Sequence, residues 1–503
     1  MDDLGFLLIG FARVLSPENL AMLFIGLSIG MAVGIMPGLG IVNGIILALP
    51  FTYKMGIEPS IILLSSIYMA GTYAGAYTAI LYRIPGESND IPLLWDGYRM
   101  AQQGQAAKAL GWALVAALTG GLVSTMVMVG LATPLSKLAL SFGAPDYFAA
   151  VMFGLSTVVA LGGKSIVNAL LGLCIGLIIS TVGVDGIYGT SRFTFDLPVL
   201  ESGIPYLTAL IGMYGVGEVL SRMRQPAAAA EGGNSNVKTA IPSWSEIWGL
   251  RATLARSTVL GTFLGAIPGA GATVTSFIAY GVEKQYGKRG AQLGSGLPEG
   301  IVAPQIGSTA SVASHMVPLL TLGLPGSGAT AIILAAFLLH GVQPGPLLFS
   351  TVASKTAAYT IFASMFAAVI GMCLMSFFWI RATVKMLSVP TPFLDSAIVM
   401  FCVLGVYADR NNMSDVWMVA IFGALGYLFE KYSFPVAPLV LGVILGPIAE
   451  NAFMQSMISF DNDWTIFFRS AIGGPLMVMA ILVLFYPLIK QMLGARRRGA
   501  RTA

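Results

Sequence analysis

The sequence predicts an all-α integral membrane protein that crosses the bilayer many times. Of its 503 residues, 56% are hydrophobic and only 10% are charged, whereas roughly a quarter of the residues of an ordinary soluble domain are charged. Several apolar stretches approach or exceed the ~20 residues that a helix needs to span a bilayer; they cover residues 109–133, 165–184, 353–380 and 466–493. None of them alternates polar and apolar residues, which disfavours a membrane β-barrel.

The N-terminus, the cysteines and the charges restrict the class further. The chain starts Met1-Asp2-Asp3 without the cationic start and cleavage site of a signal peptide, so its first helices are expected to remain in the mature protein. Three widely spaced cysteines, Cys174, Cys373 and Cys402, lie in apolar runs and are interpreted as small core residues. The net charge of +4 comes from cations in loops, which indicate orientation in a membrane and not nucleic-acid binding.

A polar segment divides the chain into two halves. Residues 222–256 interrupt the hydrophobic pattern with Ala, Gly, Asn and Ser, as a linker does. This segment and the tail at residues 494–503 are basic, and basic loops face the cytoplasm. The expected organisation is an N-terminal membrane repeat at residues 1–221, the cytoplasmic linker, and a C-terminal repeat with further spans at residues 257–493 before the tail.

The two halves contain the same motifs in the same order. Gly30-x-x-x-Gly34 followed by Ile35-Met36-Pro37-Gly38-Leu39-Gly40 recurs, offset by 231, as Gly261-x-x-x-Gly265 followed by Ala266-Ile267-Pro268-Gly269-Ala270-Gly271. A second pair, Ile84-Pro85-Gly86-Glu87-Ser88 and Leu324-Pro325-Gly326-Ser327-Gly328, follows at a similar distance. One Gly-x-x-x-Gly alone would indicate only close helix packing. The repeated order indicates an internal duplication.

The second copy of the first motif has the dimensions of a re-entrant hairpin. Residues 257–267 and 272–282 form arms of eleven residues, each about 16 Å long as a helix, which is half the ~30 Å hydrocarbon core. Arg251 and Arg256 precede the segment and Lys284, Lys288 and Arg289 follow it, so both ends are expected at the cytoplasmic face. The alternative is a single spanning helix with a proline kink.

The first copy, residues 20–53, has the same broken centre but no excess of flanking cations, so its ends are expected to face outward. Two hairpins entering from opposite faces are typical of inverted-topology repeats in secondary transporters. The predicted fold is therefore two inverted repeats with broken helices or re-entrant hairpins, which move in an elevator-like cycle.

The sequence disfavours both ATP-driven transport and enzymatic activity. The nearest match to a phosphate-binding loop, residues 158–165, has Val158 in place of the first glycine, and Gly163-Lys164-Ser165 fits a loop between helices. An enzyme would need a nucleophile with a base or a metal cluster, and His315 and His340 have no metal-ligand spacing. We therefore expect neither ATP-driven transport nor enzymatic activity, and no cofactor.

Broken helices free backbone groups that bind ions and substrates, so the candidate site comprises the breaks and the polar residues beside them. Asn43 and Thr273 supply neutral oxygens of the kind that Na⁺ accepts, although capping of the half-helices explains them equally well. His315 fits a proton relay or a hydrogen-bonded packing residue, and Glu299 is the first carboxylate to test. The candidates are Pro37, Gly38, Gly40, Asn43, Tyr73, Pro85, Gly86, Glu87, Pro268, Gly269, Gly271, Thr273, Glu299, Gln305, Ser308, Pro325, Gly326 and Ser327.

At these motifs the chain resembles the large membrane subunit of the tripartite tricarboxylate transporters. The similarity covers roughly residues 20–450 in consistent order. The matching segments are residues 34–40 with Asn43, Gly71-Thr72-Tyr73 through Ile84-Pro85-Gly86, Asp96-Gly97-Tyr98, residues 267–273, Glu283-Lys284, Glu299-Gly300, residues 318–326 and Gln343-Pro344-Gly345-Pro346.

The resemblance implies a carrier in the bacterial inner membrane that imports a small carboxylate, citrate among the family's substrates, and is driven by a Na⁺ or H⁺ gradient. It also implies two partners, a smaller membrane subunit and a periplasmic solute-binding protein. The chain departs from the family's pattern at Gln305, where a glutamate is usual, at Ser308-Thr309, where an Asn-Asn pair is usual, and at Leu93, where a threonine is common. A channel or exporter of the same fold, independent of a binding protein, is the alternative.

Overall fold

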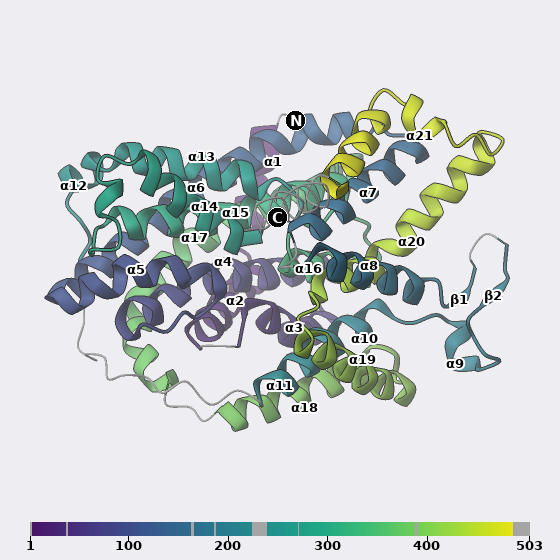
Figure 1. Ribbon diagram of the computed structural model, residues 1–503, viewed down its shortest axis with the longest axis horizontal. Coiled ribbons are helices and arrows are strands. Elements are labelled where there is room, and N and C mark those ends of the chain that lie inside the picture. Colours follow the sequence, from purple (N-terminus) through teal and green to yellow (C-terminus); the bar gives the residue numbers. More distant parts are fainter. Residues whose placement is uncertain are drawn as a thin grey trace, which may run out of the picture. The chain divides into compact units, whose positions relative to one another are not determined.

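The computed structural model describes residues 3–36, 39–161, 165–185, 188–223, 239–269, 271–387 and 391–485 (Figure 1). Pro37 and Gly38, the basic tail at residues 494–503 and residues 224–238 of the predicted linker lie outside these ranges. The chain forms two compact units, one of residues 1–137 and 224–401 and the other of residues 138–223 and 402–503. Each unit thus contains chain from both halves of the sequence.

The first unit holds all the predicted helix breaks. Its helices are α1 (Asp3–Val14), α2 (Pro17–Ile35), α3 (Ile41–Thr52), α4 (Ile57–Tyr82), η1 (Ser88–Asp90), α5 (Ile91–Met100), η2 (Ala101–Gln105), α6 (Ala106–Ala139), α12 (Trp244–Gly249), α13 (Arg251–Gly265), α14 (Gly271–Tyr286), η4 (Gly290–Gln292), α15 (Glu299–Leu322), α16 (Gly328–Leu339), η5 (Pro346–Phe349) and α17 (Val352–Leu387). The ends of α6 and the helix α18 (Thr391–Arg410) pass into the second unit.

The second unit is also mainly helical. It comprises α7 (Ala144–Leu161), α8 (Ile166–Ser180), α9 (Pro198–Glu201), α10 (Tyr206–Leu210), η3 (Ile211–Val216), α11 (Gly217–Arg222), α19 (Met413–Lys431), α20 (Val436–Ser459) and α21 (Ile466–Arg469). Its one described sheet is an antiparallel pair, β1 (Gly183–Val184) and β2 (Ser191–Arg192). Helix α20 packs on α8, where Gly176 lies against the backbone of Leu439.

In the N-terminal half, α2, α3 and α4 form a motif of one hairpin and one long helix. Helix α2 runs parallel to α4, because Gly26 and Gly34 lie against the backbone of Leu63 and Gly71 in the same order. Helix α3 runs the opposite way, since its start lies beside Gly71 and Ser60 donates to the carbonyl at its end, Thr52. Helices α2 and α3 are therefore the antiparallel arms of a hairpin.

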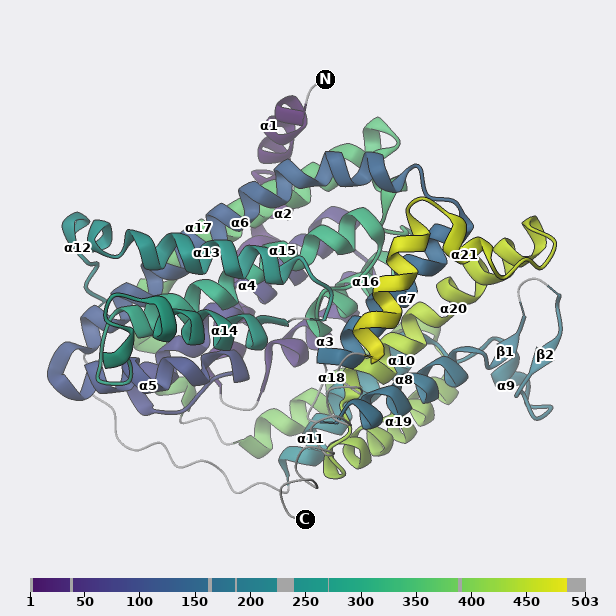
Figure 2. The same cartoon turned by 45° about the horizontal axis from the view of Figure 1, so that its top comes forward.

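The C-terminal half repeats this motif with α13, α14 and α15, which lie side by side (Figures 1 and 2). Gly261 and Gly265 of α13 lie against Gly307 and Ser311 of α15. At the open end of the hairpin, the Glu283 carboxylate of α14 accepts hydrogen bonds from Thr253 and Arg256 of α13. The arms are thus antiparallel and do not continue along one axis as in a kinked helix.

The long helices α4 and α15 form the centre of the first unit. Every residue of α15 from Glu299 to Thr321 is buried, as is nearly all of α4 from Pro59 to Tyr82. The polar residues of α15 therefore contact neighbouring helices of the protein. This arrangement satisfies the requirement that polar groups at membrane depth be shielded from lipid.

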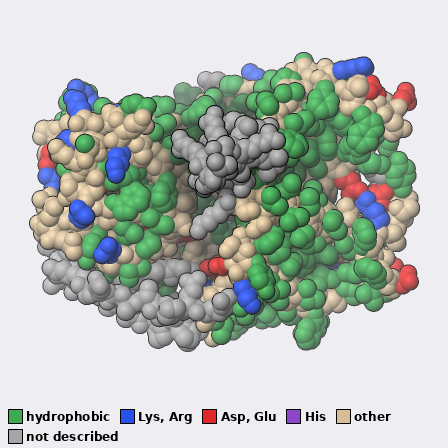
Figure 3. Space-filling model, in the orientation of Figure 1, with side chains coloured by type: hydrophobic (Ala, Val, Ile, Leu, Met, Phe, Trp, Pro, Cys, Tyr) green, Lys and Arg blue, Asp and Glu red, His purple; other side chains and the backbone are tan. Residues whose placement is uncertain are grey.

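The outer surfaces are suited to a bilayer. In the part of the chain that the structure describes, five helical segments are long and apolar enough to cross a membrane, namely Pro17–Ile35, Ser88–Leu138, Val352–Ile380, Met413–Lys431 and Val436–Ser459. Large apolar side chains are exposed at spacings of four residues, as with Val259 and Phe263 of α13 and Leu374 and Phe378 of α17. Hydrophobic side chains cover much of the surface seen in Figure 3. The chain is a multi-pass membrane protein, as predicted.

Three expectations need correction. The apolar stretch 466–493 does not form one helix, because its described part divides into α21 and a second helix, Gly473–Phe485; between them the Asp146 carboxylate accepts the Ser470 hydroxyl and the Gly473 N–H. The C-terminal part of the predicted linker is helical, since Ser243 and Glu246 form a capping box at α12. Cys174 is exposed on the apolar surface of α8 and is not a core residue.

Close contact between α2 and α4 requires glycine, which gives a testable prediction. A Cβ atom on Gly30 would lie 2.5 Å from the carbonyl oxygen of Ile67. Gly30→Ala should therefore push the helices apart and lower the stability by about 1–3 kcal/mol, measured as a lower Tm of the detergent-solubilised protein. Gly281→Ala, at an exposed helical glycine with open space around it, is the matched control and should not lower Tm. Equal Tm values for Gly30→Ala and the wild type would contradict the packing.

Candidate functional site

In the N-terminal half, the Glu87 side chain joins the two helix breaks. Helix α3 begins at Ile41, directly after Gly40, whose φ of 71° favours glycine. The Glu87 carboxylate accepts the hydrogen bond of the Ile41 N–H. A negative charge at this position complements the exposed N–H groups and the dipole of a helix N-terminus. Glu87 therefore caps the half-helix that follows the first break.

Asp90 completes this arrangement and was not among the predicted site residues. Its Oδ2 accepts the Glu87 N–H at 2.9 Å, and its Oδ1 accepts the Asn89 side-chain amide at 3.0 Å. The carboxylate is fully buried, and a Cβ on Gly75 would lie 1.8 Å from it. The sequence signal that could have identified Asp90 is the spacing Glu87-x-x-Asp90, which is that of a capping box.

In the C-terminal half, the two breaks meet directly through the backbone. The N–H of Gly269 donates to the carbonyl oxygen of Gly326 at 3.0 Å. Ser327 then caps α16 by accepting the Thr330 N–H at 3.3 Å. A Cβ on Gly326 would lie 2.7 Å from the ring of His315. The absence of a side chain at Gly326 thus lets the second break reach both α15 and the tip of the α13–α14 hairpin.

Side chains from the two halves connect these paired breaks. The Tyr68 hydroxyl of α4 lies 2.8 Å from Nδ1 of His315 and 3.1 Å from the Ser327 hydroxyl. The Ser276 hydroxyl of α14 donates to the carbonyl oxygen of Asn89 at 2.6 Å. Helices from both halves of the sequence therefore bring four helix breaks into one region of the first unit. These breaks follow α2, α4, α13 and α15, and we call the region the break cluster.

Three buried polar atoms on α15 have no hydrogen-bond partner among the described residues: Gln305 Oε1, Ser314 Oγ and His315 Nε2. Buried polar groups are nearly always paired, so such atoms require an explanation. Ser308 lies seven residues before His315 and shares its helix face, whereas Gln305 lies ten residues before it and is turned by about 80°. Of the three atoms, His315 Nε2 belongs to a side chain that contacts the break cluster, so it leaves free hydrogen-bonding capacity there.

The predicted site residues divide into two groups. Those that the structure places in or beside the break cluster are Gly40, Asn43, Pro85, Gly86, Glu87, Pro268, Gly269, Gly271, Thr273, Gln305, Ser308, Pro325, Gly326 and Ser327. Asn43 uses its side-chain amide locally, as a donor to the Leu39 carbonyl. Thr273 is half-buried in the first turn of α14.

Tyr73 and Glu299 lie elsewhere. The Tyr73 hydroxyl donates to Tyr77, which in turn donates to the Ser376 carbonyl of α17 at 2.9 Å. Glu299 begins α15 and forms two hydrogen bonds with Arg289, at 2.8 and 2.7 Å. It precedes His315 by 16 residues, or about 24 Å along the helix axis. Both residues have structural partners that their sequence positions do not reveal.

No group of three or more His, Cys, Asp or Glu side chains that could hold a metal ion occurs among the described residues. Oxygen atoms in the break cluster nevertheless come from several carbonyls, hydroxyls and the two carboxylates of Glu87 and Asp90. Oxygens of this kind are the ligands of hard cations.

Capping by Glu87 can be tested without knowledge of the solute. Glu87→Ala removes the acceptor of the Ile41 N–H, and the loss of a helix cap costs about 0.5–2 kcal/mol. We expect faster hydrogen exchange in the first turn of α3, measured by mass spectrometry on the purified protein. Glu201→Ala, at an exposed glutamate of α9, should leave exchange in α3 unchanged. Unchanged exchange in α3 of the Glu87 variant would contradict the cap.

The similarity of this chain to known proteins extends over the whole break cluster. Residues 20–441 match the tripartite tricarboxylate transporter TctA family. An uncharacterised 52.8 kDa protein from the TAR-I ttuC' 3' region of Agrobacterium vitis is 34% identical over 481 residues, which are 96% of this chain and 95% of that protein. A second protein, from the TAR-II ttuC' 3' region of the same organism, is 35% identical over 230 residues, 46% of this chain and 94% of its own length.

Proposed function

Because this chain belongs to the tripartite tricarboxylate transporter TctA family, we propose that it is the translocation subunit of a secondary transporter that imports a small carboxylate through the bacterial inner membrane. Family membership confirms the resemblance predicted from the motifs. The observation that carries the proposal is the break cluster, in which four helix breaks from both halves of the sequence bring backbone and side-chain polar groups together inside the protein. Broken helices at repeat interfaces are where secondary transporters bind solutes and ions.

The charges of the break cluster support coupling to a cation. Asp90 is fully buried and Glu87 partly buried, and neither has a cationic partner among the described residues. A carboxylate solute would be repelled by these two groups unless their charge were compensated. Binding of Na⁺, or of protons, to the break cluster would remove the repulsion. Solute and cation would then bind together, which is the requirement for symport.

The proposed transport cycle follows from the hairpins. Basic residues surround the open end of the α13–α14 hairpin, and the Arg13–Glu58 ion pair closes the corresponding end of the α2–α3 hairpin without a cationic excess. By the positive-inside rule, this difference in charge supports open ends at opposite membrane faces. An inverted topology and an elevator-like movement of the break cluster across the membrane are therefore part of the proposal.

The tripartite family also supplies the proposed partners. A periplasmic solute-binding protein would deliver the carboxylate, and a small membrane subunit would complete the transporter. Transport that depends on a binding protein distinguishes this proposal from a channel or exporter of the same fold. Such a channel would conduct the solute in liposomes that contain this chain alone.

The energy source is testable in cells or proteoliposomes. Uptake of a labelled carboxylate should stop when ionophores collapse the Na⁺ and H⁺ gradients, and should continue when ATP is depleted but the gradients are maintained. Addition of the binding protein should stimulate uptake at least tenfold. Uptake that follows ATP and ignores the gradients would contradict the proposal.

The role of Asp90 in coupling gives a second test. Asp90→Asn keeps the size of the side chain but removes its charge, so a bound cation loses a ligand and its attraction. We expect uptake to fall at least tenfold, together with a weaker dependence on Na⁺ or pH. Asp461→Asn, at an exposed aspartate of the second unit, is the matched control and should transport normally. An Asp90 variant with normal uptake and normal ion dependence would exclude this role.

A further inference from the structure

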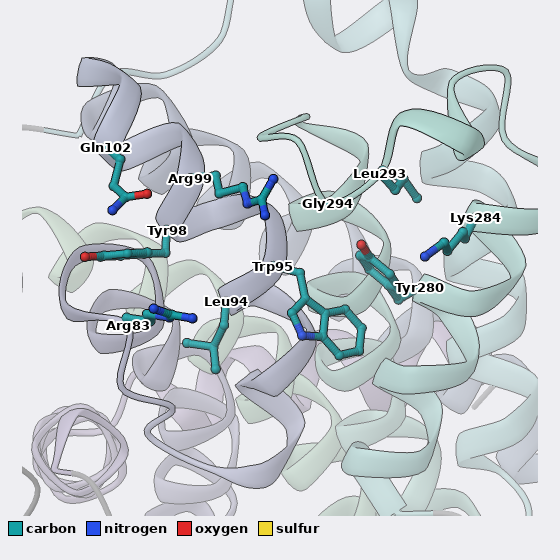
Figure 4. Close-up of a pocket in the computed structure, with 10 residues that line it drawn as sticks. All are labelled: Arg83, Leu94, Trp95, Tyr98, Arg99, Gln102, Tyr280, Lys284, Leu293 and Gly294. Atoms are coloured by element: carbon teal, nitrogen blue, oxygen red, sulfur yellow. The ribbon is translucent and has the colours of Figure 1, made fainter.

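A basic pocket of about 580 Å³ lies in the first unit, apart from the contacts that define the break cluster (Figure 4). Cavities of 300–1,000 Å³ are typical of small-molecule sites. The pocket is formed by the end of α4, by α5, by the last turns of α14 and by the loop before α15. Its lining residues are Arg83, Leu94, Trp95, Tyr98, Arg99, Gln102, Tyr280, Lys284, Leu293 and Gly294.

Three cations line this pocket, and their charges are not neutralised. Arg83, Arg99 and Lys284 have no ion pair with a carboxylate among the described residues. The Arg83 guanidinium lies 5.8 Å from the centre of the Tyr98 ring. Figure 4 shows these side chains on opposite sides of the pocket, with Trp95 and Tyr280 between Arg99 and Lys284.

The nearby carboxylates are engaged elsewhere. Asp96, beside Trp95 in α5, accepts the N–H groups of Gly294, Gly296 and Leu297 at 2.9 Å and the Tyr280 hydroxyl at 3.0 Å. Glu283, beside Lys284, binds Thr253 and Arg256. The charge of Glu283 is compensated by Arg256, whereas Asp96, which is bound only by neutral donors, offsets one of the three positive charges. The lining therefore keeps a net positive charge that a ligand can meet.

The same Asp96 contacts hold the pocket in shape. They attach the loop at residues 294–297 to α5, and a Cβ on Gly300 would lie 2.0 Å from the Asp96 carboxylate, so glycine is required there. The Trp95 and Tyr280 rings pack edge to face, with centroids 4.7 Å apart. The two sides of the pocket, which come from different halves of the sequence, are therefore fixed relative to each other.

Arg83 lies at the end of α4 and relates the pocket to the break cluster. Arg83 ends α4 in the left-handed conformation, with φ 58°, which residues with a Cβ seldom adopt. Arg83 follows Gly75, the neighbour of Asp90, by eight residues, or about 12 Å along α4. Arg83, which lines the pocket, is thus separated along α4 by only a few helical turns from the position where Asp90 contacts Gly75.

We propose that this pocket is a binding site for the carboxylate groups of the transported solute, at the basic end of the first unit and separate from the break cluster. Three separate cations match several negative groups, and guanidinium groups pair with carboxylates through two hydrogen bonds. The aromatic walls contact the hydrocarbon part of the solute. The inference rests on the proposed function, and the positive-inside rule places the pocket at the cytoplasmic face, where an imported solute is released.

The test measures equilibrium binding to the full chain purified with its small membrane subunit. Citrate and succinate should bind at least ten times more tightly than acetate, by isothermal titration calorimetry. Arg99→Gln and Lys284→Gln should each weaken binding of citrate at least tenfold, whereas Arg99→Lys should retain part of it. Lys288→Gln removes an exposed cation four residues from Lys284 and outside the pocket, and should bind as the wild type does.

Unchanged citrate and succinate binding in Arg99→Gln and Lys284→Gln, with normal Tm, would overturn the proposal. A phosphate-bearing lipid headgroup has similar charge, so the measurements are repeated in nanodiscs of phosphatidylcholine with and without phosphatidylglycerol. Retention of phosphatidylglycerol that depends on Arg99 and Lys284, without carboxylate binding, would assign the pocket to lipid and also overturn the proposal. Carboxylate uptake by the same variants separates the outcomes, because normal uptake with unaltered binding rejects only the pocket, and no uptake by the wild type rejects the proposed function.

Discussion

The structure of the first unit depends on the need to pair backbone groups that helix breaks release inside the protein. Water is absent from the hydrocarbon core, so each freed N–H or C=O group requires a partner from the protein, a cavity or a ligand. The chain provides Glu87 for the start of α3, Ser327 for α16, and the Gly326 carbonyl for Gly269. These contacts draw the four breaks together into the break cluster.

Close packing of glycine makes this assembly sterically feasible. Gly26, Gly30 and Gly34 bring α2 against α4, and Gly261 and Gly265 bring α13 against α15. In both halves the long helix is consequently buried, and the hairpin tip reaches the middle of that helix. Small residues serve the same purpose at the second breaks, where Gly75 accommodates Asp90 and Gly326 accommodates His315. Small residues therefore allow both the close approach of the helices and the assembly of the break cluster.

The distribution of charge separates two regions of the first unit. The break cluster contains the carboxylates of Glu87 and Asp90, whereas three cations line the basic pocket and the Asp96 carboxylate beside it offsets only part of their charge. In the proposed function, an anionic solute would be attracted to the pocket and would need a cation to enter the break cluster. The last turns of α4 connect the two regions. In the proposed function, binding of a cation or proton at Asp90 would therefore favour the solute in the break cluster over the solute in the basic pocket.

The sequence alone determined the membrane class, the family and the positions of the helix breaks, because long apolar runs and Pro-Gly interruptions express local physical requirements. It also favoured a hairpin at residues 257–282, although α13 and α14, with 15 and 16 residues, are longer than the eleven-residue arms expected, and α2 is by itself long enough to cross a membrane. Only the tertiary structure decided which polar residues meet. Tyr73 faces α17 and Glu299 pairs with Arg289, whereas Asp90, which resembles a loop residue in sequence, is buried beside Gly75. Such pairings join residues from distant helices, and no local pattern specifies them.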